Sequence, residues 1–295
     1  MRPVSVAATQ MACTWDSQAN IEKAIQMVRA AAEAGAQIIL LQELFETPYF
    51  CIEQHNEHLS LARSQADSTL LQQMQALAAE LAVVLPVSWY EQEGQCYFNS
   101  IAIIDADGSV LGVYRKSHIP NCVGYQEKTY FTPGDTGFKV WQTRYANIGV
   151  GICWDQWFPE AARCMALNGA ELLFYPTAIG SEPGNELLDS RDHWRRVMQG
   201  HAAANIMPVI ASNRIGFESA SNTPGLDMTF YGSSFISDYT GEIVEQADDA
   251  SETVLVHSFD LDQIKAYRHE WGLFRDRRPD LYADICQHTP GHPSA

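Results

Sequence analysis

Apolar and polar positions follow two different spacings in the first forty residues of the chain. Residues 4–10 and 37–42 are short apolar runs, which predict strands. Between them, Ile21, Ile25 and Val28 recur at helical spacing, so residues 20–34 predict a helix with Asn20 as its N-cap. This segment therefore predicts a strand–helix–strand unit.

The same two spacings continue to residue 213 and include a hairpin. Residues 97–116 predict two strands joined by a turn at Ala106, Asp107 and Gly108. A loop-rich stretch follows to Arg144. The other predicted strands are 83–91, 148–153, 171–175 and 208–213, and the other predicted helices are 69–82, 159–167 and 192–205. Strands that alternate with helices and hairpins indicate an α/β fold whose sheets are covered by helices.

The chain of 295 residues contains no Pro-, Gly- or Ser-rich linker that would divide it into domains. The loose segments are residues 219–225 and the end of the chain. We therefore predict a single domain over residues 1–286 and a flexible tail over residues 287–295.

Two segments share a local order of elements. Residues 31–44 and 164–177 both run from a helix through Gly-Ala into an apolar strand, with Gly35 and Gly169 placed to end the helices. This short match suggests an internal duplication.

Composition is typical of a folded protein from a reducing compartment. Hydrophobic residues make up 46% of the chain, which is enough for a sizeable core, and no run of about 18 apolar residues predicts a membrane span. The seven cysteines form no CxxC pair and no basic–apolar leader opens the sequence, so we predict no disulfide framework and a cytoplasmic location. Only His55 and His58 among nine histidines lie close together, which predicts no metal site.

The formal net charge of −17 disfavours negatively charged partners. It repels phosphate backbones and anionic membranes, and no Lys/Arg stripe interrupts it, so we predict neither a nucleic-acid nor a membrane partner. The acidity either keeps the protein soluble or attracts cationic substrates, and the second role requires a specific acidic pocket.

Three chemically capable residues follow the ends of predicted strands. Glu43 ends an apolar run, Lys116 ends the hairpin, and Cys153 lies between a strand and a helix that begins with proline. Helix N-terminal amides near Cys153 favour the thiolate, although a small buried structural cysteine is the alternative. If the three strands are neighbours in one sheet, a base, a cation and a nucleophile converge as acyl transfer requires.

Four ordered blocks resemble the Glu, Lys and Cys blocks of the nitrilase superfamily, which comprises carbon–nitrogen hydrolases acting on nitriles, amides and ureides. They are "LLQELF", "YRKSHIPN", "GYQEKTYFTPGD" and "GVGICWDQWFPEAAR". The similarity runs nearly end to end and is strongest to a branch that hydrolyses a carbamoylated diamine. It implies a four-layer αββα sandwich, doubled to αββα-αββα across a dimer, and an enzyme without a cofactor.

The resemblance also implies roles for individual residues. Glu43 would act as the general base, Lys116 as the cation that stabilises the oxyanion, and Cys153 as the nucleophile that forms a thioester-type intermediate. Glu127 matches a second acidic position that orients the substrate or Lys116. Without the resemblance, Glu127 reads as a surface charge paired with Lys128.

The implied substrate is a small cationic ureide, whose pocket needs apolar walls and a distant carboxylate. Substrate-binding residues are predicted from aromatic character and from position after a strand: Trp154, Tyr130, Tyr49, Thr177 and Ala178. For the substrate cation we select Glu182 from a loop that also holds Glu186, Asp189 and Asp192.

Other functions remain open from the residues. Arg191, Arg195 and Arg196 suit the carboxylate of an N-carbamoyl amino acid, and plain ω-amides are further candidates. A phosphatase that pairs Cys153 with Arg163 is disfavoured by their spacing, and a catalytically silent scaffold is the non-enzymatic reading.

The chain is expected to form a homodimer or a higher homo-oligomer. Its C-terminal segment, residues 269–286, combines aromatic residues with clustered arginines, a composition that suits a subunit interface.

Overall fold

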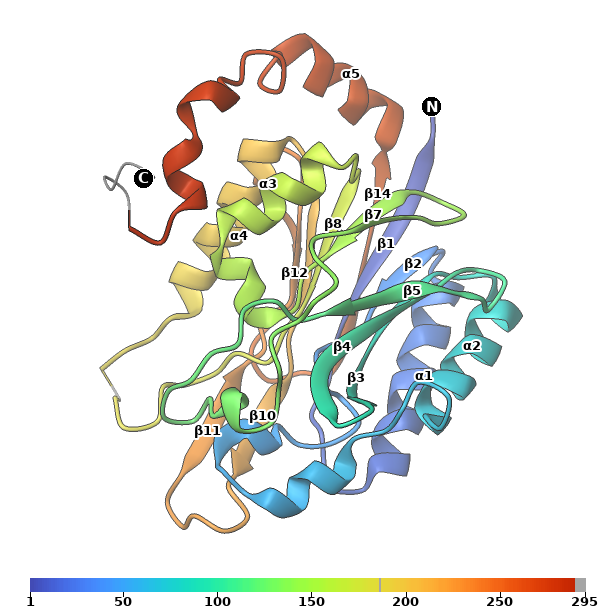
Figure 1. Ribbon diagram of the computed structural model, residues 1–295. Coiled ribbons are helices and arrows are strands. Elements are labelled where there is room, and N and C mark those ends of the chain that lie inside the picture. The colour runs from blue at the N-terminus through green and yellow to red at the C-terminus, as the bar shows by residue number, and fades with distance from the viewer. Residues whose placement is uncertain (186, 290–295) are drawn as a thin grey trace.

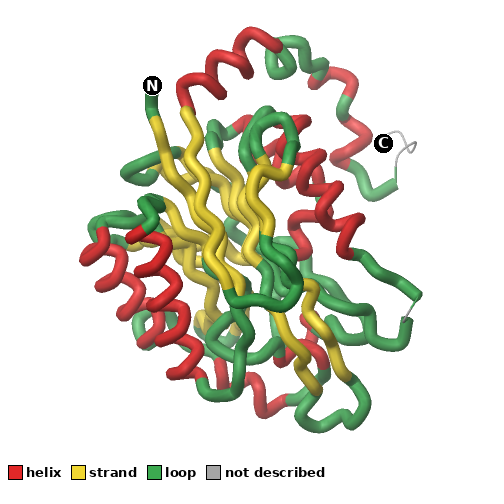
Figure 2. The backbone as a smooth tube through the Cα atoms, turned by 180° about the vertical axis from the view of Figure 1, so that it is seen from behind, coloured by secondary structure: helices red, strands yellow, loops and turns green. Residues whose placement is uncertain are grey.

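Two β-sheets face each other in the computed structural model, which describes residues 1–185 and 187–289 (Figures 1 and 2). The first sheet contains β14 (Thr253–Asp260), β1 (Pro3–Gln10), β2 (Ile38–Leu40), β3 (Leu85–Glu93), β4 (Cys96–Ile104) and β5 (Val110–Arg115). A bridge between Ile38 and Val84 joins its two halves. The second sheet contains, in order, β13 (Ile243–Gln246), β12 (Phe235–Ser237), β9 (Val209–Ser212), β8 (Leu172–Pro176), β7 (Asn147–Val150) and β6 (Val140–Gln142).

Helices cover the outer face of each sheet. The helices are α1 (Ser17–Glu33), α2 (Thr69–Leu81), α3 (Pro159–Leu167), α4 (Arg191–Asn205) and α5 (Leu261–Trp271). The first two pack on the first sheet, and α3 and α4 pack on the second (Figure 1). The four layers form the αββα sandwich that the resemblance implies.

Alternation along the strands explains why the layers form. Val6 and Ala8 of β1 pack between the two sheets, whereas Ala7 points the other way, toward α1. In the second sheet, Leu172 of β8 belongs to the same inner core, and its neighbour Leu173 packs under α3 and α4. Because successive side chains of a strand point to opposite faces, one apolar run supplies two cores.

A strand–helix–strand unit occurs in both sheets, in agreement with the suggested duplication. β1 and β2 are parallel around α1, and β7 and β8 are parallel around α3. Gly35 and Gly169 follow the two helices with φ of +93° and +97°, a backbone region that glycine adopts without strain.

Several predicted boundaries are corrected by the structure. Asp16, not Asn20, caps α1, because its carboxylate accepts the Ala19 N–H at 3.0 Å. Asn20 lies one turn inside the helix, buried, where its side-chain amide donates to the carbonyls of Thr14 and Glu46. Residues 219–225, considered as a linker, belong to the turn of a hairpin between β10 (Ile215–Ser219) and β11 (Asp227–Tyr231).

Short elements in the stretch predicted as loop were missed. They include β6 and the 3₁₀ turn η3 (Glu127–Thr129). Other 3₁₀ segments are η1 (Phe50–Ile52), η2 (Asn56–Leu61), η4 (Cys153–Trp157), η5 (Pro279–Leu281) and η6 (Ala283–Cys286).

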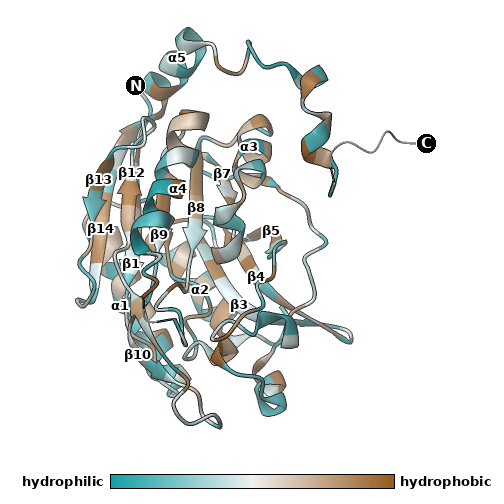
Figure 3. Ribbon diagram, turned by 90° about the vertical axis from the view of Figure 1, so that its left-hand side faces the viewer, coloured by the Kyte–Doolittle hydropathy of each residue, from teal (hydrophilic) through white to brown (hydrophobic). Residues whose placement is uncertain are grey.

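The C-terminal segment stands away from the sandwich. Figure 3 shows α5 and the chain that follows it arching beyond the ends of the strands. Trp271, Leu281 and Ile285 in this segment are exposed by 61%, 65% and 66%. The proposed tail at 287–295 lies mostly outside the described residues.

One helix end predicts a stabilising substitution. Ala82 ends α2 with φ of +53°, a left-handed conformation that costs an L-residue about 1 kcal/mol. We expect Ala82→Gly to raise the free energy of unfolding by about 0.5 kcal/mol. The gain is smaller than the strain that is relieved, because glycine loses more chain entropy on folding. Urea denaturation measures the change. Ala34→Gly, at the end of α1 where φ is −78°, is the matched control and should give no gain.

Candidate active site

The three chemically capable residues predicted from the sequence meet at strand ends that belong to different sheets. Glu43 follows β2 and Lys116 follows β5, both in the first sheet, while Cys153 follows β7 in the second. The three strands are therefore not neighbours in one sheet, which was the condition under which convergence was considered. The residues meet because the two sheets face each other, so strand ends from both sheets border the same interior space.

Lys116 is the centre of a fully buried charge cluster. Its Nζ donates to Glu43 Oε1 at 2.9 Å and to the two carboxylate oxygens of Glu127 at 2.8 Å and 2.6 Å. All three side chains have zero exposure to solvent. Glu127 thus pairs with Lys116 and not with Lys128, which is exposed.

Burial and charge act in opposite directions on this cluster. Burial by itself lowers the pKa of Lys116, but the carboxylates of Glu127 and Glu43 outweigh it and hold the pKa well above its ordinary value. Burial raises the pKa of Glu127 to about 7, although the Lys116 ammonium opposes this rise. Lys116 is therefore a permanent cation in the site.

The Glu43 carboxylate presents one occupied and one unoccupied oxygen. Oε1 accepts from Lys116 and from the Asn99 side-chain amide, the latter at 2.6 Å. Oε2 is buried and has no hydrogen-bond partner among the described residues. An acceptor that is held in place on one side and free on the other is suited to take up a proton.

Cys153 occupies a strained backbone position at the start of η4. Its φ is +41°, which places a residue with a side chain in the left-handed region. The thiol is buried, and its Sγ lies 3.8 Å from the Ala178 carbonyl oxygen. Observed strain of this kind is typical of residues whose orientation serves a function.

The expected thiolate is not favoured at this position. Burial raises the pKa of Cys153 well above its usual value, and the negative charge of Glu43 raises it further, with Lys116 opposing. The raised pKa therefore favours the neutral thiol of Cys153.

Asp155 links the loop of Lys116 to the loop of Cys153, a role that the sequence analysis missed. Its buried carboxylate accepts the Tyr114 hydroxyl at 2.7 Å and the backbone N–H of His118 at 3.0 Å. It also accepts the Ile152 N–H at 2.9 Å. Tyr114 and His118 lie two residues to either side of Lys116, so one carboxylate connects the surroundings of the cation and the thiol.

Other supporting residues were also missed, although the sequence holds a signal for one of them. Asn99 is a polar residue within the apolar run of β4 and is fully buried beside Glu43. A polar side chain at an inward position of a strand requires a partner. Asp155 gave no comparable signal, because an acidic residue early in a helical turn is also an ordinary capping residue.

Of the predicted substrate-binding residues, Tyr49 and Ala178 contact the charge cluster or the thiol, whereas Thr177 and Tyr130 bond to other groups. Tyr49 reaches the cluster, since its hydroxyl donates to Glu127 Oε1 at 2.6 Å, and Ala178 contacts Cys153. Thr177 is buried and donates to Gln156 Oε1 at 3.1 Å. Tyr130 uses its hydroxyl elsewhere, as a donor to the Glu53 carbonyl at 2.7 Å.

Trp154 differs from these residues because its side chain is 37% exposed and packs near Trp157. Its indole therefore lies partly in solvent. Its backbone N–H belongs to the peptide bond that joins Trp154 to Cys153.

Glu182 lies within electrostatic range of Tyr125. Its half-buried carboxylate accepts the Ser190 hydroxyl at 3.1 Å, and burial raises its pKa. The charges of Glu182 and Cys153 both contribute to raising the pKa of Tyr125, after the larger effect of burial. Glu186 lies outside the described residues.

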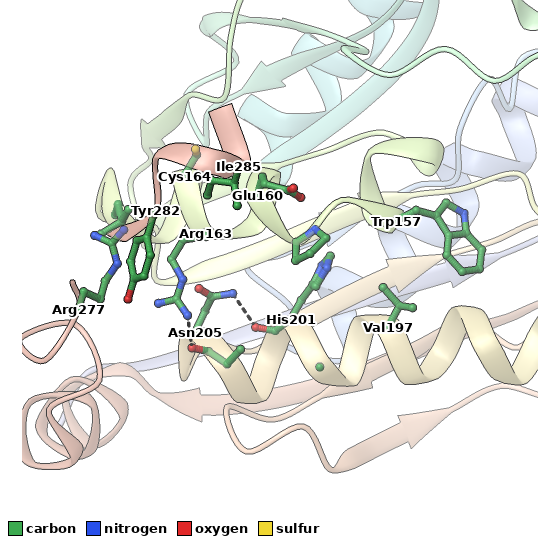
Figure 4. A pocket seen from close by; sticks show the side chains of 14 residues that line it. Trp157, Glu160, Arg163, Cys164, Val197, His201, Asn205, Arg277, Tyr282 and Ile285 are labelled. Atoms are coloured by element: carbon green, nitrogen blue, oxygen red, sulfur yellow. Dashed lines mark hydrogen bonds between the residues drawn. The ribbon is translucent and has the colours of Figure 1, made fainter. Parts of the chain in front are cut away.

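A surface groove lies apart from these residues, between α3, α4 and the C-terminal segment (Figure 4). Arg163 lines it and donates to the Ala204 carbonyl at 2.8 Å. Neither Cys153 nor Lys116 lines this groove. The pairing of Cys153 with Arg163 that a phosphatase would need is not formed.

Two further observations concern the described residues only. No group of three His, Cys, Asp or Glu side chains is arranged to hold a metal ion. None of the helices at 1–185 and 187–289 combines the length and apolar character needed to cross a membrane.

The chain belongs to the carbon-nitrogen hydrolase family, which it matches over residues 5–269. The similarity thus covers both sheets, the four covering helices and the whole candidate site.

Individual relatives narrow the comparison. The chain is 62% identical to "N-carbamoylputrescine amidase" of Solanum tuberosum, over 95% of this chain and 94% of the relative. It is 51% identical to "Citrullinase" of Francisella tularensis subsp. tularensis, over 97% and 99%. A solved structure, the carbon-nitrogen hydrolase of Helicobacter pylori G27, superposes with a TM-score of 0.90 at 37% identity, over 97% of this chain and 99% of that one.

The raised pKa of Glu127 predicts a pH-dependent stability. Between its ordinary pKa of 4.5 and about 7, the folded protein holds a proton on Glu127 that the unfolded chain has released. The free energy of unfolding should therefore fall as pH rises through this window, by at most about 1.4 kcal/mol per pH unit from this group.

Chemical denaturation at several pH values measures this slope. Glu127→Gln should remove the contribution of Glu127, whereas Glu22→Gln, on the exposed face of α1, should leave the slope as in the wild type. Equal slopes in all three proteins would contradict the assignment.

Proposed function

We propose that the protein hydrolyses N-carbamoylputrescine to putrescine, carbon dioxide and ammonia, with Cys153 as nucleophile. The observation that carries the proposal is the free Oε2 of Glu43 in a buried cluster whose charges act on the Cys153 thiol. Identities of 59–62% to four plant proteins named N-carbamoylputrescine amidase support the substrate. The reaction would supply putrescine for polyamine biosynthesis from agmatine.

In the proposed first step, Glu43 removes the proton of the Cys153 thiol and the sulfur attacks the ureide carbonyl. The carbonyl oxygen gains negative charge, which Lys116 and the Trp154 backbone N–H stabilise. A neutral thiol beside a free carboxylate oxygen suits this order, because the nucleophile is charged only when the base takes its proton.

In the second step, protonated Glu43 gives its proton to the leaving amine, and putrescine departs from a carbamoyl thioester on Cys153. Glu43 then activates water, which hydrolyses the thioester to carbamic acid and restores the thiol. Carbamic acid decomposes to carbon dioxide and ammonia. Glu127 and Tyr49 act on Lys116 by fixing its position.

Glu182 is the proposed partner of the substrate ammonium. It is a half-buried carboxylate with one hydroxyl partner, so it retains capacity to accept from a cation. The charges of Glu182 and Cys153 both act on the Tyr125 phenol, which supports a position of Glu182 within reach of a substrate at the thiol. Tyr49, Thr177 and Ala178 are proposed to line the path between the two ends.

A ureido amino acid such as citrulline is the second candidate substrate, because one relative is named Citrullinase. Its carboxylate would need an available cation. Arg191 pairs with Asp249 at 3.0 Å, and Arg195 and Arg196 both pair with Asp192. These arginines are engaged by acidic groups, which favours the diamine derivative.

We further propose a cytoplasmic homodimer or higher homo-oligomer of single-domain subunits. The seven free cysteine thiols are consistent with a reducing compartment. The groove of Figure 4 and the exposed apolar residues of the C-terminal segment offer a surface for a second copy.

Trapping of the carbamoyl group tests the chemistry. Cys153→Ala should lose ammonia release from N-carbamoylputrescine completely, because no nucleophile remains, and should show no adduct. Glu43→Gln should lose about three orders of magnitude in kcat or more, since base catalysis alone contributes about 10²–10⁴-fold.

Intact mass spectrometry after mixing with substrate should detect one carbamoyl group on the wild type and none on Cys153→Ala. These variants are preferable to Lys116→Ala, which would leave two buried carboxylates without a counterion and threaten folding. Activity retained by Cys153→Ala would refute the proposed function.

Two substrates that differ in the terminal ammonium test the role of Glu182. Glu182→Gln should lower kcat/KM for N-carbamoylputrescine by about ten- to a hundredfold, because a charge-assisted contact becomes a neutral one. Butylurea, which has the same carbon chain without the ammonium, should be affected less than threefold.

Asp192→Asn is the matched control. Asp192 is an exposed acid near the same loop, and its carboxylate pairs with Arg195. It should change neither substrate by more than about twofold. Equal losses on both substrates in Glu182→Gln would remove Glu182 from the ammonium site. Preferred turnover of citrulline would select the second candidate.

A further inference from the structure

The loop that joins β2 to η1 carries two groups of the candidate site. Glu43 lies at its start, and Tyr49, whose hydroxyl holds Glu127, lies at its end. Leu44, directly after Glu43, has φ of +46°, a conformation that L-residues rarely adopt without support. The position of the proposed base therefore depends on what holds this loop.

Arg214 supplies most of that support. It immediately precedes β10, and its guanidinium is fully buried. Nη2 donates to the carbonyl of Glu43 at 2.8 Å and to that of Leu44 at 3.0 Å, and Nη1 donates to the Thr47 carbonyl at 3.3 Å. Three loop carbonyls are thus bound by one side chain.

Glu218 completes the support from the other end of the same hairpin strand. Its Oε1 accepts from Arg214 Nη1 at 2.9 Å, and its Oε2 accepts the backbone N–H of Tyr49 at 2.6 Å. The pair is therefore bonded to the loop at both ends. The Phe230 ring, whose centroid is 5.2 Å from the guanidinium carbon, packs beside Arg214.

We propose that Arg214 and Glu218 are positioning residues that hold the Glu43 carboxylate at the Cys153 thiol and, through Tyr49, hold Glu127 at Lys116. The inference rests on the proposed function, because it assigns the clamped carboxylate the role of base. Neither residue touches the reacting atoms.

The geometry separates this role from that of a generic buried ion pair. A buried pair commonly contributes little net stability, since desolvation offsets attraction. Here the Arg214 guanidinium directs its donors at the consecutive carbonyls of Glu43 and the strained Leu44. The Glu218 carboxylate accepts the backbone N–H of Tyr49. A planar fork can bind several acceptors in fixed directions, whereas a lysine ammonium is a single point.

Arg214→Lys keeps the charge and removes the fork, so it tests the clamp. We expect kcat to fall by about a hundredfold with KM changed less than threefold, because a displacement of about 1 Å in a catalytic group has such an effect. Glu218→Gln, which loses one of its two acceptor contacts, should lower kcat by a smaller factor and provides a second, milder variant.

The reactivity of the thiol supplies a readout that a merely structural role would not move. Site-resolved iodoacetamide labelling of Cys153 at neutral pH should slow in Arg214→Lys, because the displaced base no longer assists deprotonation. Both measurements are made well below the melting temperature of each variant, so that loss of folded protein does not contribute.

Arg268→Lys is the matched control. Arg268 is half-buried on α5 and also donates to backbone carbonyls, to Ile206 at 2.7 Å and 3.2 Å, but far from the site in the fold. It should lose stability without losing kcat or the Cys153 labelling rate.

The outcomes separate the two proposals. If Cys153→Ala is inactive while Arg214→Lys and Glu218→Gln keep wild-type kcat and labelling, the clamp is refuted and the proposed function stands. If Cys153→Ala remains active, the proposed function itself fails.

Discussion

The buried ammonium of Lys116 between two buried carboxylates is the interaction on which the site depends. Removing charges from water is costly unless each finds a partner. Lys116 meets this condition for Glu43 and Glu127, which come from segments more than 80 residues apart in the sequence. The three groups therefore fix the loop after β2, the end of β5 and η3 relative to one another, and the same contacts that hold the fold there also orient the chemistry.

Backbone strain lies next to this cluster and has identifiable support. Leu44 and Cys153 both have positive φ, and each adjoins or carries a group that acts in the proposed reaction. Arg214 supports the first position through loop carbonyls, and Asp155 supports the second through the Ile152 amide. Strain persists only where surrounding contacts over-determine the backbone. Two separate polar side chains, those of Arg214 and Asp155, thus hold the backbone at the proposed base and at the thiol.

The sequence predicted the parts of this structure that local spacing determines. Helix 159–167 and the hairpin around Gly108 follow from apolar periodicity and turn residues, and the structure confirms them. The strand-end positions of Glu43, Lys116 and Cys153 were visible for the same reason.

What local spacing does not encode could not be predicted. β6 has only three residues, too few to show a period. The assignment of strands to two different sheets and the reach of Arg214 to Glu43 depend on contacts between distant segments. The neutral state of Cys153 depends on burial among carboxylates, which neighbouring residues in the sequence do not reveal.

The charge balance of the site also bears on which substrates suit it. Above the pKa of Glu127, which is about 7, Glu43 and Glu127 together exceed the single charge of Lys116, and Glu182 adds a further acidic group whose charge acts on Tyr125. Because the three hydrogen bonds of Lys116 Nζ to carboxylate oxygens are already made, it offers little attraction to a substrate anion in the ground state. An excess of buried negative charge repels a carboxylate and attracts an ammonium. In the proposed reaction, Lys116 gains a further partner when the carbonyl oxygen becomes negative, so the stabilisation proposed for it belongs to the transition state.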